Sequence, residues 1–207
     1  MAITINGTGS ITGLTAGGLP DGSVTAADIE TSLDLTGKTV TLPSGTGGKI
    51  LQVASALKTD AEILTASGVT YNDLTDLNVS ITPVAAGSQI MVTGHISGLC
   101  NSGTQASIHV FRGSTEIGQA DAASSRRRCH GNIIGNLDTS VLPNWTITTS
   151  AINALDTPTY TLGDTITYKF QVASTGTVWI NRGSRDTDGT NWDFRTVSNI
   201  TVMEVAA

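Results

Sequence analysis

From about residue 49 onward, apolar residues recur at every second position, and this period restricts the fold more than any other feature. The clearest run holds Ile166, Tyr168, Phe170 and Val172, separated by polar side chains. Successive side chains of a β strand point to opposite faces, so the period predicts strands with one buried face. Such runs, separated by Gly-containing turns, recur about eight times, which predicts an all-β fold, an antiparallel β-sandwich.

The first 48 residues lack the side chains that usually close a small core. The three Trp, three Tyr and three Phe residues all lie at or beyond Tyr71, and every arginine lies at or beyond Arg112. Aromatic rings supply much of the buried area of a small domain, so this segment cannot readily fold alone. We therefore expect an extended arm over residues 1–48, then the sandwich over residues 49–207.

Two roles for the arm follow from its sequence. Apolar pairs at a spacing of two, such as Ile3 and Ile5, predict very short strands that become ordered by strand addition to a partner or by self-association of identical chains. The alternative is a plain flexible linker. The run Pro43-Ser-Gly-Thr-Gly-Gly48 has no side chains to pack, and we place the domain boundary there.

Charge and hydropathy exclude several classes of protein. The net charge of -6 argues against a nucleic-acid partner, because neutralising phosphates requires clustered Lys and Arg. No apolar run reaches the length of a membrane span, and Met1–Gly18 lacks the features of a signal peptide, so synthesis in a cytoplasm is expected. Cys100 and Cys129 lack metal-ligand spacing and are expected to be free thiols.

Both ends of the chain resemble virion proteins of tailed phages. The C-terminal residues that look like the jelly-roll-type domains of tail fibres are Ser198-Asn-Ile-Thr-Val-Met-Glu-Val205, Trp179-Ile-Asn-Arg182 and Asp186-Thr-Asp188. The arm residues similar to N-terminal parts of such proteins are Ile3-Thr-Ile-Asn-Gly-Thr-Gly9, Leu14–Val24 and Thr36–Pro43. The resemblance implies a jelly-roll-like sandwich, a homotrimer, contact with other virion proteins and binding of host-surface glycans, with no chemistry and no cofactor.

The leading hypothesis is a short phage fibre whose arm docks on the particle and whose sandwich presents loops for host attachment, because the arm and the sandwich differ so strongly in composition and both resemble such proteins. No repeat shaft separates arm from sandwich, which departs from a typical long fibre. The alternative is a capsid decoration or cement protein that stabilises the head. A third class, a glycan-cleaving enzyme of the tailspike type, would depend on carboxylates such as Asp186 or Asp188. Nothing in the sequence argues for this third class, so we expect a non-catalytic protein.

A loop near the C terminus concentrates polar oxygen ligands. Asp186, Asp188, Asn191 and Asp193 lie in a Gly-containing segment, and short flexible loops of this kind bind hard cations such as Ca²⁺. The EF-hand pattern is incomplete, however, so this is a weak metal candidate. The favoured alternative is a loop whose carboxylates are neutralised by the neighbouring arginines Arg182, Arg185 and Arg195.

Two further groups are candidates for partner contact. Trp192 lies in this polar loop beside Asp186 and Asp188 and could stack on a sugar ring, whereas Trp179 lies in a strand and is expected to be buried. Arg126, Arg127 and Arg128 form the one basic cluster. They could bind phosphate, sulfate or an acidic patch of a partner, or pair with acidic residues of this chain, which we favour.

The histidines and the known catalytic motifs give no sign of an active site. His95 and His109 occupy alternating positions in predicted strands, so each should point out of a sheet in a structural role, without a metal. The sequence has no G-x-S-x-G, Walker or H-E-x-x-H pattern. No cofactor is therefore expected.

Overall fold

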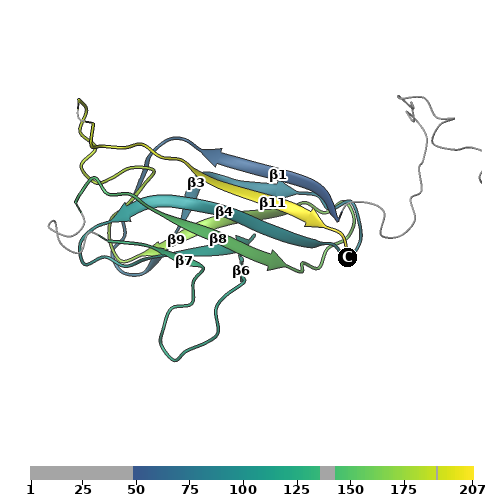
Figure 1. Ribbon diagram of the computed structural model, residues 1–207. Helices are drawn as coiled ribbons and strands as arrows, with labels where there is room; N and C mark the ends of the chain where they lie inside the picture. The colour runs from purple at the N-terminus through teal and green to yellow at the C-terminus, as the bar shows by residue number, and fades with distance from the viewer. Residues whose placement is uncertain (1–48, 136–142, 190) are drawn as a thin grey trace, which may run out of the picture. The chain divides into compact units, whose positions relative to one another are not determined.

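A computed structural model describes residues 49–135, 143–189 and 191–207, so the arm predicted over residues 1–48 lies outside the described part. Within these ranges all regular secondary structure is β strand, which confirms the all-β prediction (Figure 1). The strands are β1 (Ile50–Lys58), β2 (Glu62–Leu64), β3 (Thr70–Ile81), β4 (Gln89–Cys100), β5 (Ala106–Arg112), β6 (Thr115–Ile117), β7 (Gly131–Ile133), β8 (Thr148–Asp156), β9 (Ile166–Ser174), β10 (Val178–Ile180) and β11 (Ser198–Val205).

The strands form two antiparallel sheets. In the first, β1 pairs with β11, which pairs with β4, and β8 pairs with the opposite edge of β4; β10 and β2 extend this sheet at the end of β4. In the second, β3 pairs with β9, which pairs with β5, and both β6 and β7 pair with the far edge of β5.

Eight of these strands thus follow the orders β1-β11-β4-β8 and β3-β9-β5-β7, the connectivity of a jelly roll.

The core lies between the two sheets and uses the alternation read from the sequence. Ile90, Val92 and Ile96 of β4 face Phe170 and Val172 of β9, and all five side chains are fully buried. Because the opposite face of β4 carries Met91, Thr93 and His95 in half-buried positions, each sheet has one apolar inner face and one outer face.

The outer face of the first sheet carries an apolar row across four strands. Val53 of β1 pairs with Met203 of β11, Met203 pairs with Met91 of β4, and Met91 pairs with Leu155 of β8. Val53 and Leu155 are 59% and 53% exposed. We call these four residues the outer row. β11 lies between β1 and β4 and carries apolar side chains on both faces, with Ile200 and Val202 in the core and Met203 in the outer row.

One burial prediction is wrong. Trp179, expected in the core, is half-buried, and its neighbours Val178 and Ile180 fill the core instead. Side chains of a strand alternate, and β10 turns its two β-branched residues inward, which places the indole on the outer face.

The described residues include no helix that is both long and apolar enough to cross a membrane.

Candidate functional site

The connection between β10 and β11, described here as the end loop (residues 182–197, of which 190 is not described), is held by arginine–carboxylate pairs. Asp186 accepts from Arg182 at 2.9 Å and from Arg195 at 2.6 Å. Arg185 donates from Nε to both carboxylate oxygens of Asp193, each at 3.0 Å. These side chains span a short loop from both directions, so the ion pairs fix its course.

The weak cation site is occupied by protein donors. Asp186 and Asp193 are already neutralised by arginines, and Asp188 accepts a hydrogen bond of 2.9 Å from the backbone N–H of Gly189. Asn191 is exposed. Across the described ranges, no group of three or more His, Cys, Asp or Glu side chains is arranged to hold a metal ion. This arrangement favours the arginine-neutralised loop.

Aromatic rings are gathered at the same end of the sandwich. Trp192 and Phe194 are 65% and 58% exposed, which is unusual for such large apolar side chains. The guanidinium carbon of Arg185 lies 4.5 Å from the ring centroid of Trp145, a distance that permits a cation–π contact. Arg185 therefore joins this ring to Asp193 and holds the two parts of the loop region together.

Two cavities are lined by residues of the end loop, and Phe194 lines one of them, whereas Trp192 lines neither. One, of about 360 Å³, is lined by Trp145, Thr146, Ile147, Thr149, Phe194 and Thr196. The other, of about 430 Å³, is lined by Asp186, Thr187, Asp188, Gly189, Asp193 and Arg195. One cavity is thus walled partly by aromatic rings and the other by carboxylates and an arginine. An apolar wall next to fixed polar groups is the usual composition of a binding site for a small polar ligand.

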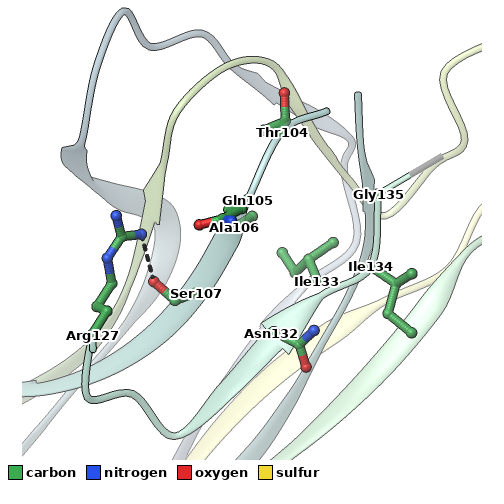
Figure 2. Close-up of a pocket in the computed structure, with 9 residues that line it drawn as sticks. All are labelled: Thr104, Gln105, Ala106, Ser107, Arg127, Asn132, Ile133, Ile134 and Gly135. Atoms are coloured by element: carbon green, nitrogen blue, oxygen red, sulfur yellow. Dashed lines mark hydrogen bonds between the residues drawn. The ribbon is translucent and has the colours of Figure 1, made fainter. Parts of the chain in front are cut away.

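The three adjacent arginines do not act as one cluster. They lie in the long β6–β7 connection, which projects from the sandwich (Figure 1). Arg126 and Arg128 are exposed, whereas Arg127 is half-buried and donates from Nη1 to Ser107 Oγ at 3.1 Å (Figure 2). The same nitrogen lies 3.5 Å from the carbonyl oxygen of Ala173. The basic charge is therefore divided between the surface and an internal contact.

Arg127 meets a chain of polar groups that the sequence analysis did not connect. Ser107 Oγ lies 2.9 Å from Nε2 of His109, and Nδ1 of the same ring lies 2.6 Å from Oε1 of Glu116. His109 is fully buried, although it points away from the core as predicted, and the ring of Tyr71 lies over it at a centroid distance of 4.8 Å. A serine, a histidine and a carboxylate are thus hydrogen-bonded in sequence.

A signal for this arrangement exists in the sequence. Ser107 and His109 are two positions apart in a predicted strand and so share one face. The turn Arg112-Gly-Ser-Thr115 brings Glu116 back beside that strand, where Glu116 pairs with Phe111. The other histidine in a strand, His95, bonds through Nε2 to the carbonyl oxygen of Val197 at 3.0 Å, in keeping with a structural role.

Both cysteines are free thiols. Cys100 is fully buried, and its single S–H proton has two carbonyl acceptors within reach, Ile133 O at 3.2 Å and Thr104 O at 3.3 Å from Sγ. Burial raises the pKa of this thiol to about 11. At neutral pH Cys100 is therefore a protonated core side chain rather than a nucleophile.

Comparison with known proteins yields a distant structural similarity. No protein-family model matches the sequence, and no curated protein matches it. A chain in the structure of infectious bursal disease virus, Gx strain, is similar to this chain with a TM-score of 0.36 and 12% sequence identity. The match covers 75% of this chain and 37% of that chain, so this chain spans little more than a third of its neighbour. A similarity this distant assigns no function.

Proposed function

We propose that this chain is a structural protein of a virus particle, a short fibre of a tailed phage, whose end loop binds a host-surface glycan. The observation that carries the proposal is the pair of exposed rings, Trp192 and Phe194, beside arginine-paired carboxylates on one loop. Sugar rings present a flat C–H face and a rim of hydroxyl groups. Aromatic side chains suit the face, and carboxylates and guanidinium groups suit the rim.

The ion pairs make such a site rigid before the ligand arrives. Arg185 holds Asp193 and packs on Trp145, and Arg182 and Arg195 hold Asp186. Side chains that are already ordered lose little entropy when a ligand binds, which favours affinity. Asp188 is exposed and can accept hydroxyl groups of the ligand in addition to the backbone N–H of Gly189.

The fold is compatible with this function. Jelly rolls occur in viral capsid and lectin domains, which supports the proposal by analogy, although the fold by itself does not determine function. In the proposed protein, residues 1–48 dock on other virion proteins and the sandwiches associate as a homotrimer. The outer row supports self-association, because Val53 and Leu155 are large, apolar and more than half exposed. Neither role requires a chemical step.

The same row favours the second candidate, a capsid decoration protein. Apolar groups aligned across a whole sheet are suited to covering by another protein subunit, and a capsid surface would supply one. The two functions differ in copy number and position. A decoration protein covers the head in many copies, whereas a fibre occupies a few sites, so electron microscopy of particles carrying a labelled chain separates them.

Glycan binding is tested with the purified full-length chain on an array of bacterial surface polysaccharides. We expect selective binding, and we expect Trp192→Ala to weaken binding about fivefold, because stacking on an aromatic ring contributes about 1 kcal/mol. The matched control is Leu162→Ala, at a position that is also exposed (56%) but outside the end loop. Equal binding by Trp192→Ala and the unmodified chain would contradict the proposed site.

The docking role of the arm is tested by deleting residues 1–48. The remaining chain contains every described strand, so it should fold and bind glycan but should be missing from purified particles. Incorporation at the normal level would show that the sandwich carries the docking surface instead.

A further inference from the structure

The geometry points to a nucleophilic serine site on the outer face of the second sheet, formed by Ser107, His109 and Glu116 and acting on small carboxylic esters. This activity goes beyond the proposed attachment role and does not depend on it. The three side chains come from adjacent strands, with Ser107 and His109 on β5 and Glu116 on β6. They are connected by two hydrogen bonds, of 2.9 Å and 2.6 Å.

The two hydrogen bonds run in the direction that activates a serine. The carboxylate of Glu116 accepts a hydrogen bond from Nδ1 of His109. This bond favours the tautomer of His109 that carries its proton on Nδ1. The other nitrogen, Nε2, is then an acceptor facing Ser107 Oγ. The competing acceptor for the hydroxyl proton, the carbonyl oxygen of Ala173, is farther away at 3.3 Å. A nucleophile, a base and a group that orients the base are the elements of serine catalysis on many folds.

Arg127 supplies the positive charge that such a reaction requires. Its Nη1 lies 3.1 Å from Ser107 Oγ, so the guanidinium group is next to the position at which a carbonyl oxygen becomes negatively charged during attack. A charged donor fixed at this place stabilises the tetrahedral intermediate. The β6–β7 connection holds Arg127 at this position, so this long loop contributes a residue to the proposed site.

A cavity gives access to the serine. It measures about 350 Å³, and its lining includes Ser107, Arg127, Asn132 and Ile134 (Figure 2). Figure 2 shows Ser107 and Arg127 together at one side of this space, joined by their hydrogen bond. Ligand cavities start at roughly 300 Å³, so this space suits an acyl group of a few carbon atoms.

All three side chains are shielded from bulk water, and Ser107, which is 7% exposed, borders the cavity. His109 is fully buried beneath Tyr71, and the side chain of Glu116 is 14% exposed. Ser107 alone among the three lines the cavity. Electrostatic interactions are stronger away from water, so this arrangement strengthens both hydrogen bonds.

The reaction proceeds in two steps, acylation of Ser107 and hydrolysis of the acyl-serine. Ser107 Oγ forms a bond to the ester carbonyl carbon while its proton passes to His109 Nε2, and collapse of the tetrahedral intermediate breaks the bond to the alcohol oxygen, which takes that proton. Water then attacks the acyl-serine, again giving its proton to Nε2. The carboxylic acid leaves and Ser107 regains its proton. Water is the co-substrate.

A purely structural network makes a different prediction. Buried polar groups are normally hydrogen-bonded, so the same contacts could serve stability alone. In that case each substitution would lower stability, and Ser107 would react no faster than any other serine. Chemical reactivity of one hydroxyl group therefore separates the two explanations.

The test treats the purified full-length chain with a fluorophosphonate probe, which modifies activated serines, and with p-nitrophenyl acetate as the ester. We expect mass spectrometry to find the probe on Ser107. Ser107→Ala should remove the label and lower ester hydrolysis at least about 100-fold, the usual contribution of a positioned base and nucleophile. Glu116→Gln keeps the shape of the side chain but removes its charge, so it should slow labelling by a similar factor.

The matched control is Ser97→Ala, at a buried serine whose Oγ lies 2.8 Å from Thr149 Oγ1 and which has no hydrogen bond to a histidine of the described ranges. This variant should be labelled at the normal rate. Absence of probe on Ser107 in the folded wild-type chain, or unchanged labelling of Glu116→Gln, would overturn the proposal, and the first result does not depend on any variant folding. Glycan binding should persist in Ser107→Ala, so failure of this site is distinguishable from failure of the attachment role.

Discussion

Gln52 of β1 donates a hydrogen bond of 2.6 Å from Nε2 to the carboxylate of Glu204 on β11, and this bond joins neighbouring strands at one end of the first sheet. Glu204 is fully buried and also accepts bonds of 3.1 Å from the backbone N–H groups of Val84 and Ala85. Burial alone raises the pKa of this carboxyl, but the hydrogen bonds outweigh it and hold the pKa below its ordinary value of 4.5.

The first prediction concerns Glu204→Gln. The pKa is lower in the folded chain, so the stabilisation is present above the unfolded value, about 4.5, and is lost as the pH falls through the folded value. At neutral pH the substitution should lower the free energy of unfolding by about 2 kcal/mol, the typical contribution of hydrogen bonds to a charged group. Urea unfolding at neutral pH and well below pH 4.5 checks this. A loss of equal size at both pH values would contradict it.

Gly94→Ala tests the close approach of β4 and β11. A Cβ at this position would overlap the backbone carbonyl oxygen of Asn199, which cannot move without breaking strand pairing. We expect a loss of about 3 kcal/mol, at the upper end for overpacking, measured by urea unfolding. The control is Gly131→Ala, whose Cβ would lie 3.5 Å from Ser150, an ordinary contact, and stability should change little. Similar losses in the two variants would refute the explanation.

The strands were predictable from sequence, but their pairing was not. Alternation identifies Ile90, Val92 and Ile96 as one face of a strand because the period depends only on local backbone geometry. The pairing of Met91 with Leu155 on one side and Met203 on the other depends on contacts between distant segments. Trp179 shows the same limit, since a short strand with three apolar residues does not reveal which face turns inward.

Of the two candidate sites, one could be identified from the sequence and the other could not. The loop around Trp192 was identifiable because its polar residues are adjacent in sequence. Ser107, His109 and Glu116 were not identified as a group, because their connection requires a hairpin register that places Glu116 opposite Phe111. Arg127 reaches them only through the fold of the thirteen-residue connection between Ile117 and Gly131, which no local pattern describes.

Leu155→Lys tests self-association through the outer row. Leu155 is 53% exposed, so a lysine should not disturb the folded chain, but it would place a charge within the apolar contact. We expect the unmodified chain to sediment as a trimer and the variant to sediment as a monomer with unchanged unfolding. The control is Val84→Lys, at a position 65% exposed and outside the row, which should remain trimeric. A monomeric unmodified chain, or a trimeric Leu155→Lys, would rule out this interface.

Arg185→Ala tests whether one side chain organises the end loop. The substitution removes the two bonds to Asp193, whose side chain is only 8% exposed, together with the contact to Trp145. Because a largely buried carboxylate then loses its cation, we expect a loss of about 2 kcal/mol in the free energy of unfolding and weaker glycan binding. Arg185→Lys keeps the charge but not the planar guanidinium group, so it should recover only part of the lost stability and part of the lost glycan binding. The matched control is Arg195→Ala, where the side chain is 57% exposed and Arg182 still holds Asp186, so stability should change by less than about 1 kcal/mol. Equal effects at positions 185 and 195 would show that the loop does not depend on the Arg185 contacts.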